Sequence, residues 1–232
     1  MGMRIAIIPA RGGSKRIPRK NIKIFMGKPM IAWSIEAAKD SGCFDKIIVS
    51  TDDKEVASIA HQYGAEVPFI RPDNLSNDFA TTSEVIKHSI NFFENEGFKL
   101  DVVCCIYATA PFIHPSDLQC GLKTLLTEHA DYALSVCSYP FPIQRAIAIT
   151  DNQRLAMLQP EYMTARSQDM PDFYHDAGQF YFGKSDAWKS DLPIFGENSI
   201  PIILPRYRVQ DIDNEEDWLQ AELMASNEMG LT

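Results

Sequence analysis

Short apolar segments alternate with longer amphipathic segments through the first 138 residues of this chain. The short segments have the length of buried strands, and the longer ones repeat apolar side chains every three or four positions, as a helix with one buried face does. Strands are predicted over 5–8, 46–49, 66–70, 101–107 and 132–136, and helices over 30–41, 53–63, 81–96 and 115–129. This alternation is typical of an α/β protein with a mainly parallel sheet and helices on both faces.

The alternation weakens in residues 139–176, which contain four prolines, several aromatic side chains and little periodicity. The elements expected beyond this stretch are strands over 178–183 and 200–204 and a helix over 214–227. We therefore predict one α/β domain formed by residues 1–138 and 177–232. Residues 139–176 are expected to be inserted into it as a hairpin arm, a lid or an oligomerisation element.

The composition indicates a folded domain that acts away from membranes. Of the 232 residues, 45% are apolar and 23% are charged, which is enough apolar material for a sizeable core. The longest apolar runs are far shorter than the ~18 residues of a membrane span, and no secretion signal is evident in the first residues. The five cysteines form no CxxC pair and are interpreted as reduced thiols, so a cytoplasmic location is expected.

Charge is distributed unevenly along the chain. The formal net charge is −9, yet no acidic residue precedes Glu36. The eight basic residues of that first stretch are Arg4, Arg11, Lys15, Arg16, Arg19, Lys20, Lys23 and Lys28. An acidic chain is a poor candidate for nucleic-acid binding, which depends on neutralising many phosphates, whereas a local basic patch suits a small anionic ligand.

The segment Arg11–Asn21 is the strongest candidate for binding that anion. It follows the first predicted strand, and parallel sheets bind ligands beyond the carboxyl ends of their strands. Gly12 and Gly13 let the backbone approach a ligand closely, and Ser14 adds a hydroxyl donor. The cations available for a triphosphate are Arg11, Lys15, Arg16, Arg19 and Lys20. A solvated basic loop is the alternative, and the absence of GxGxxG and GxxxxGK[ST] motifs disfavours a dinucleotide oxidoreductase or a P-loop kinase.

A second candidate site lies near the end of the chain. Asp211 and Asp213 are two residues apart, so on an extended segment their carboxylates face the same side. One or two carboxylates together with substrate phosphates commonly hold Mg²⁺. The alternative is that Asp213 or Asn214 caps the final helix while Asp211 is exposed. Read together with the basic segment, the pair favours a site for Mg²⁺ and a triphosphate.

Residues 10–21 closely resemble the N-terminal signature of the acylneuraminate cytidylyltransferases, the CMP-sialic acid synthetases. Further segments similar to that family, in the family's order, are Gly27–Met30, Ile48–Asp52, Arg71–Pro72, Asp78–Thr82, Thr109–Pro111 and Asp211–Asp213. The resemblance implies a Rossmann-like nucleotidyltransferase fold and a homodimer in which residues 139–176 reach across to the partner. It also implies Mg²⁺-dependent transfer of CMP from CTP to the anomeric hydroxyl of a nonulosonic acid, with release of pyrophosphate.

The resemblance and the chemistry of the basic segment together assign roles to individual residues. Nucleotide binding is assigned to Arg11, Gly12, Gly13, Ser14, Lys15, Lys20, Asn21, Arg71, Thr81 and Thr82. Catalysis is assigned to Arg11, Lys20 and Asp211, and Mg²⁺ binding to Asp211 and Asp213. Contact with the sugar is assigned to Tyr107, Arg166 and His175. The His175–Asp176 pair, which no Ser or Cys nucleophile motif accompanies, is interpreted as a substrate-binding or structural element.

The chain departs from the family's pattern at two places near the expected sugar pocket. Tyr107 and Ile113 stand where the family often has Gln and Arg, and His175–Gly178 stands where it has Arg-Pro-Asn-Gly. These changes favour a sugar other than N-acetylneuraminate, and the chain looks most similar to the branch that activates pseudaminic acid. N-acetylneuraminate, legionaminate and 3-deoxy-octulosonate remain alternative substrates, and a non-catalytic nucleotide-sugar-binding module remains an alternative function.

Overall fold

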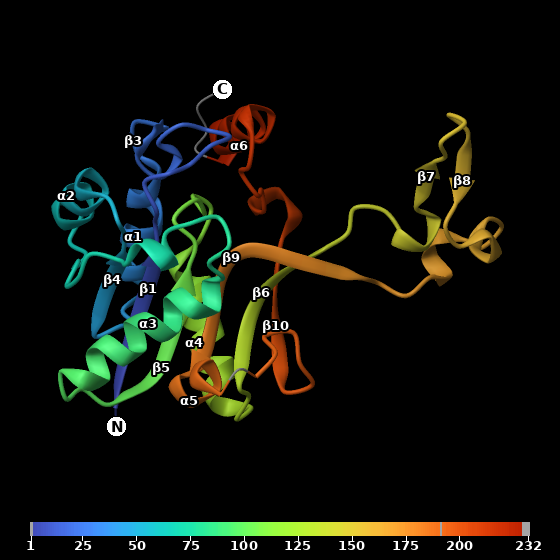
Figure 1. The fold of residues 1–232 in the computed structure, drawn as a ribbon. Helices are drawn as coiled ribbons and strands as arrows, with labels where there is room; N and C mark the ends of the chain where they lie inside the picture. The colour runs from blue at the N-terminus through green and yellow to red at the C-terminus, as the bar shows by residue number, and fades with distance from the viewer. Residues whose placement is uncertain (1, 191, 229–232) are drawn as a thin grey trace.

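A six-stranded sheet forms the centre of the structure, a computed structural model that describes residues 2–190 and 192–228 (Figure 1). Its strands are β1 (Met3–Pro9), β4 (Lys46–Ser50), β5 (Leu100–Ile106), β6 (Tyr132–Ser138), β9 (Tyr174–Lys184) and β10 (Ser199–Leu204). The spatial order is β10-β6-β9-β5-β1-β4. Strand β9 runs antiparallel to both of its neighbours, and the other pairings are parallel. The prediction of a mainly parallel sheet is confirmed.

Helices cover both faces of this sheet. Alternate side chains of each strand point to opposite faces, and on each face they pack against helices in a separate apolar cluster. On β1, Ala6 and Ile8 belong to one apolar cluster and Ile5 and Ile7 to another. The first cluster is completed by α1 (Met30–Ser41), α2 (Lys54–Gln62) and α4 (Pro115–Thr127). The second is completed by α3 (Thr82–Asn95) and α5 (Ser185–Lys189). Within the described residues, no helix is both long and apolar enough to cross a membrane.

A third apolar cluster joins the start of the chain to its last described helix, α6 (Glu215–Glu228). Ile17 and Phe25 are fully buried there, and Trp218 of α6 packs against Phe25 with ring centroids 5.5 Å apart. This packing places the residues just before α6 beside the basic segment. It also explains the structure between the predicted strand 5–8 and the predicted helix 30–41, where the sequence indicates no regular element. This structure is a 3₁₀ turn, η1 (Lys20–Ile22), and a small hairpin of β2 (Ile24–Phe25) and β3 (Lys28–Pro29).

The strand predicted over 66–70 is wrong. Glu66 and Ile70 each form one isolated parallel bridge, with Ile48 and Thr51, and no continuous ladder joins them. Pro68 lies between the two bridges and lacks the N–H that a ladder requires. The segment continues into a 3₁₀ turn, η2 (Asp73–Leu75), which leads to α3.

Residues between β6 and β9 leave the sheet and form an arm that projects away from the body of the molecule (Figure 1). Its tip is a short hairpin of β7 (Ile147–Ile149) and β8 (Leu155–Met157). Three 3₁₀ turns complete it: η3 (Ile143–Arg145), η4 (Pro160–Tyr162) and η5 (Ser167–Asp169). Its exposed apolar side chains include Phe141, Ile147, Ile149, Leu155, Leu158 and Met163. Residues 174–176, which the sequence assigns to the inserted stretch, already belong to β9.

Candidate active site

A cavity of about 590 Å³ opens at the carboxyl ends of β1 and β5, the edge where parallel sheets bind ligands. The basic segment contributes Arg11, Ser14, Lys15, Arg16, Lys20 and Asn21 to its wall. The segment around the start of α3 contributes Arg71, Leu75, Asn77, Asp78, Ala80, Thr81, Thr82 and Val85. Tyr107, Ala108 and Thr109 follow β5, and Asp213 completes the wall from the far end of the chain. Gly12, Gly13 and Asp211 are not among the described residues that line it.

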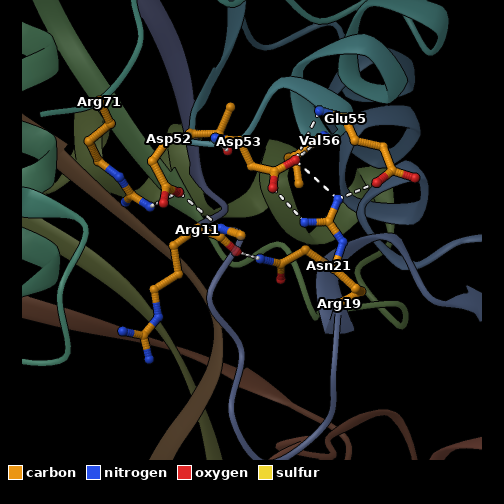
Figure 2. A network of polar contacts seen from close by, with 10 residues as sticks. Arg11, Arg19, Asn21, Asp52, Asp53, Glu55, Val56 and Arg71 are labelled. Carbon is orange, nitrogen blue, oxygen red and sulfur yellow. Dashed lines mark hydrogen bonds and ion pairs between the residues drawn. The ribbon is translucent and has the colours of Figure 1, made fainter. Parts of the chain in front are cut away.

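The basic segment is shaped by contacts behind the cavity wall (Figure 2). The Gly12 amide donates to Asp52 Oδ1 at 2.9 Å, and the Asn21 side chain donates to the Arg11 carbonyl at 2.9 Å. A Cβ at Gly12 would lie 2.5 Å from Asp53 Oδ2, so only glycine fits this close approach. Gly12 therefore packs the loop against the end of β4, and its amide is already bonded to the protein.

Arg19 joins the first turn of α2 (Figure 2) and is not among the described residues that line the cavity. Its guanidinium forms ion pairs with Asp53 and Glu55, and Asp53 caps α2 by accepting from the amides of Glu55 and Val56. The hydrogen bond from Arg19, opposed by some desolvation and supported by the cap amides, lowers the pKa of Asp53 to about 2. One of the five cations expected to face a triphosphate thus has a structural role.

The other cations of the segment line the cavity and face carboxylates. Arg11 bonds Asp78 Oδ1 at 2.6 Å, and Lys15 bonds the other oxygen of the same carboxylate. Hydrogen bonds from these two side chains lower the pKa of Asp78. The Asp78 carboxylate holds these two cations together. The position therefore favours a negatively charged group.

Arg71 is the buried cation of the cavity, with 4% of its surface exposed. Its Nη2 lies 3.8 Å from Asp52 Oδ1, too far for a hydrogen bond, and its Nε and Nη2 have no hydrogen-bond partner among the described residues. Burial lowers the pKa of the guanidinium. Buried donors are nearly always satisfied in folded proteins, so the side chain is suited to an acceptor group from a ligand.

The C-terminal segment brings Asp213 to the opposite side of the basic segment. Arg16 bonds Asp213 Oδ1 at 2.8 Å, and Lys20 lies 3.5 Å from the same oxygen. Lys20 also donates to the carbonyl of Ile212. Asn214, rather than Asp213, accepts from the first amides of α6, at 2.9 Å from Glu216 and 3.0 Å from Asp217, so Asp213 is not consumed as a cap.

A buried ion pair anchors the stretch that leads to these carboxylates. Arg208, in the turn η6 (Arg206–Arg208), bonds Asp117 Oδ2 of α4 at 2.6 Å, and Gln179 of β9 donates to the Arg208 carbonyl at 2.6 Å. The segment after η6 is therefore tied to the main body before it reaches the cavity.

Desolvation, with a smaller contribution from the like charge of Asp213, raises the pKa of Asp211.

The oxygen donors Asp211 and Asp213 decide which metal ion this part of the molecule could hold. The described residues contain no cluster of three or more His, Cys, Asp or Glu side chains that could hold an ion by themselves. Two nearby carboxylates beside a cavity rich in cations fit Mg²⁺, which takes one or two carboxylates and completes its shell with phosphate oxygens and water. They do not fit Zn²⁺ in a closed structural site, which requires four protein ligands.

The three residues predicted to contact the sugar lie in different places. Tyr107 lines the cavity, and its hydroxyl lies 3.4 Å from that of Tyr181. His175 lies at the start of β9, with its ring against Tyr139, and Arg166 is exposed on the arm and pairs with Asp169 at 2.8 Å. Arg166 and His175 do not line the cavity of their own chain within the described residues.

The model of the family described as "Cytidylyltransferase" matches residues 5–217, which is most of the chain and both sides of the cavity. The chain belongs to the cytidylyltransferase family. As a cytidylyltransferase it is a transferase, and the resemblance found in its motifs is confirmed.

Two relatives of this cytidylyltransferase match it over nearly its whole length. It is 42% identical over 220 residues to the pseudaminic acid cytidylyltransferase of Campylobacter jejuni strain 81-176, covering 95% of each chain. It is 33% identical to the CMP-N,N'-diacetyllegionaminic acid synthase of Legionella pneumophila, covering 98% of each. The solved structure of CMP:2-keto-3-deoxy-manno-octonic acid synthetase complexed with CTP superposes with a TM-score of 0.72 at 18% identity, covering 97% of this chain and 99% of that one. This last likeness confirms the nucleotidyltransferase fold.

Some features of the cytidylyltransferase cavity escape sequence reasoning. Asp78 stands in a family-like segment and has no role of its own assigned from the sequence, whereas it bridges Arg11 and Lys15 across more than 60 positions. Tyr181 lies within a predicted strand and carries no motif of its own. The sequence does indicate which residues meet at the cavity edge. Arg11, Asp52 and Tyr107 each follow a strand of the parallel set, and the carboxyl ends of such strands lie at one edge of the sheet.

Proposed function

We propose that this cytidylyltransferase transfers CMP from CTP to the anomeric hydroxyl of a nonulosonic acid, pseudaminic acid, and releases pyrophosphate. The observation that carries the proposal is the cavity at the carboxyl ends of β1 and β5, lined by several cations and by Asp213, which pairs with two of them. The choice of sugar is supported by 42% identity, over 95% of both chains, to a pseudaminic acid cytidylyltransferase.

In the proposed reaction, the sugar hydroxyl oxygen bonds to the α-phosphorus while the bond from that phosphorus to the β-phosphate oxygen breaks. The hydroxyl proton passes to solvent water, and negative charge grows on the departing pyrophosphate. Arg11, Lys15 and Lys20 line the cavity and would stabilise that charge, since preorganised cations act strongly on developing charge. The triphosphate would replace Asp78 as the partner of Arg11 and Lys15.

The remaining residues of the cavity would position the nucleotide. Arg71 would donate its unpartnered N–H groups to nucleotide acceptors, and Asn21, Thr81 and Thr82 add amide and hydroxyl groups to the same wall. Gly12 would act indirectly, by allowing the loop to pack close to Asp53. Holding the reacting groups in one orientation supplies a large part of the rate enhancement in phosphoryl transfer.

Asp211 and Asp213 would hold Mg²⁺ together with phosphate oxygens. When bound, the ion would neutralise charge on the triphosphate and polarise the α-phosphorus. Arg16 and Lys20 contact Asp213 without it and would release that carboxylate in exchange for the phosphates. Mg²⁺ is proposed because the two carboxylates supply oxygen ligands and lie beside the cations that would hold the phosphates.

The arm would belong to a homodimer. Its exposed apolar side chains at Ile147, Ile149 and Leu155 require a covering surface, and Arg166 is not among the described residues that line the cavity of its own chain. A partner subunit that receives the arm would bring Arg166 toward the sugar site of the other chain. We further infer a cytoplasmic site of action, because the five cysteines are free and the reaction draws on CTP.

The function is tested by measuring pyrophosphate release from CTP and Mg²⁺ with pseudaminic acid, legionaminate, N-acetylneuraminate and 3-deoxy-octulosonate in turn. We expect the highest kcat/KM with pseudaminic acid. Asp213→Asn should lower kcat at least a hundredfold, because one metal ligand is lost, while Asp40→Asn, an exposed carboxylate on α1, should match the unmodified enzyme. Absence of release with every sugar would refute the proposal, and full activity of Asp213→Asn would remove the metal role.

A further inference from the structure

Three side chains form a line from the cavity wall into β9. Tyr107 lines the cavity, and its ring meets that of Tyr181 edge to face, with centroids 5.5 Å apart and hydroxyl oxygens 3.4 Å apart. The Tyr181 hydroxyl donates to Asp176 Oδ2, and the other oxygen of that carboxylate accepts from the Gly178 amide at 2.8 Å. The cavity is thus connected to a carboxylate that does not line it.

A bulge in β9 makes this line possible. Residues five apart on a regular strand point to opposite faces, so Asp176 and Tyr181 would not meet. Gly178 has a φ of +61°, and the register of β6 against β9 shifts between Leu134 and Val136. Between the pairings of Leu134 with Tyr181 and of Val136 with Asp176, β9 has three more residues than β6, an odd number, so the alternation is reset and the carboxylate and the hydroxyl come to the same side.

The direction of the hydrogen bonds follows from the carboxylate. An ionised carboxylate only accepts, so the single proton of the Tyr181 hydroxyl is used on Asp176. The Tyr181 oxygen can then only accept from Tyr107, whose own proton is used in turn. Burial raises the pKa of both phenols, which keeps them protonated and able to donate. The Tyr107 oxygen therefore presents lone pairs, and no proton, to its surroundings.

We propose that Asp176 and Tyr181 are positioning residues that fix the Tyr107 hydroxyl as a hydrogen-bond acceptor for an N–H or O–H group of the sugar acid. The inference rests on the proposed function, because it concerns the second substrate of that reaction. The Thr82 hydroxyl shares this part of the wall and can donate to one lone pair of the Tyr107 oxygen, which leaves the other lone pair for the sugar. A sugar that offers only an acceptor at this point leaves two acceptors facing each other, which is unfavourable in a partly buried site.

The proposal is tested with Asp176→Asn and Tyr181→Phe, both of which keep the shape of the side chain. An asparagine can keep its oxygen on the Gly178 amide and turn its NH₂ to Tyr181, which reverses the line and makes Tyr107 a donor to the cavity. We expect KM for the sugar acid to rise about tenfold in either variant, as the loss of one oriented hydrogen bond does, with KM for CTP within about twofold. Tyr107→Phe should show the same split, and Asp40→Asn should not.

The group recognised is identified with three forms of the sugar acid that the unmodified enzyme turns over best. One is the parent, one has its acylamino group replaced by hydrogen, and one lacks a ring hydroxyl. If Tyr107 accepts from a given group, removing that group should raise KM in the unmodified enzyme. It should not raise KM in Tyr107→Phe, where the accepting hydroxyl is already absent, and this difference identifies the recognised donor. Equal effects of every change in both enzymes would overturn the proposal.

Failure of the proposed function and failure of the positioning role give different experimental results. If the unmodified enzyme releases no pyrophosphate with any sugar acid, the proposed function fails. If it does release pyrophosphate and Asp176→Asn and Tyr181→Phe match it in both KM values, only the positioning role fails. A rise in KM for CTP alone would place Tyr107 at the nucleotide and would also overturn the inference. Thermal unfolding of each variant separates loss of fold from loss of recognition.

Discussion

The tightest requirement on a single residue is at Gly12. A Cβ there would lie 2.5 Å from Asp53 Oδ2, and that oxygen cannot retreat easily because Arg19 and the cap of α2 hold its carboxylate. We expect Gly12→Ala to lower the free energy of unfolding by about 1–3 kcal/mol and to reduce CTP affinity, because the phosphate-facing loop is pushed outward. Urea unfolding and CTP titration measure both effects.

The neighbouring Gly13 supplies the matched control. A Cβ at Gly13 meets nothing within 4 Å, and its backbone needs no left-handed conformation. Gly13→Ala should change the free energy of unfolding by no more than about 0.5 kcal/mol. Similar losses in the two variants would show that glycine is required for flexibility of the whole loop and not for contact with Asp53.

Residues that follow a strand of the parallel set could be placed from the sequence, because topology alone brings them to one edge. Arg11 and Tyr107 are of this kind. Partners across loops could not: Asp78 reaches Arg11 and Lys15 only through the path of a turn that has no periodicity to read. Arg166 was assigned to the sugar from a motif, and its placement on the arm leaves that role a prediction.

At the scale of elements, α2 carries a charge-dependent cap. The pKa of Asp53 is about 2 in the folded chain, against an ordinary value of 3.8, and hydrogen bonding by Arg19 is the main cause. A lowered folded-state pKa contributes stability above the unfolded value, and that stability is lost as pH falls through the folded value. The shift corresponds to about 2 kcal/mol for a side chain that is 21% exposed.

We expect Asp53→Asn to reveal this dependence, because asparagine still caps a helix but cannot pair with Arg19 as an anion. The variant should be less stable than the unmodified protein by about 2 kcal/mol at pH 7, and the gap should narrow between pH 4 and pH 2. Urea unfolding across that range measures it, with Asp40→Asn as reference. A gap that stays constant with pH would assign the loss to packing.

Elements in which apolar side chains recur at a regular spacing are predictable from the sequence. Elements that form only through contacts with distant parts of the chain are not. The helices α1, α3 and α4 were found near their true ends, because an apolar face and terminal Gly, Thr or Pro residues mark them. The segment 66–70 resembles a strand in composition, but Pro68 interrupts its pairing. The hairpin of β2 and β3 depends on burial of Phe25 against Trp218, almost 200 residues away.

At the scale of the whole molecule, the arm is the feature that a single chain leaves unexplained. Its apolar side chains at Ile147, Ile149 and Leu158 are more than half exposed. We expect the full chain to sediment as a dimer, and a variant with residues 146–158 replaced by a short Gly-Ser linker to sediment as a monomer. Such a linker keeps the two legs of the arm connected, so the sheet should remain intact.

The arm variant also separates assembly from chemistry. If Arg166 acts in the partner's site, the shortened chain should bind CTP as before but turn over the sugar acid more slowly. Arg166→Ala in the full chain should reproduce the slower turnover while remaining dimeric. A shortened chain that is still dimeric would place the interface elsewhere on the body.

The position of β9 in the sheet has a consequence for how the chain is made. β5 and β6 are not neighbours, because β9 lies between them in the order β10-β6-β9-β5-β1-β4. During translation β6 emerges before either of its partners, β9 and β10, and the whole arm follows it first. The nascent chain therefore carries a half-sheet of β4, β1 and β5 with an unpaired apolar strand behind it. Slow passage of the ribosome through the arm would prolong that aggregation-prone interval, so the speed of its codons bears directly on the yield of folded enzyme.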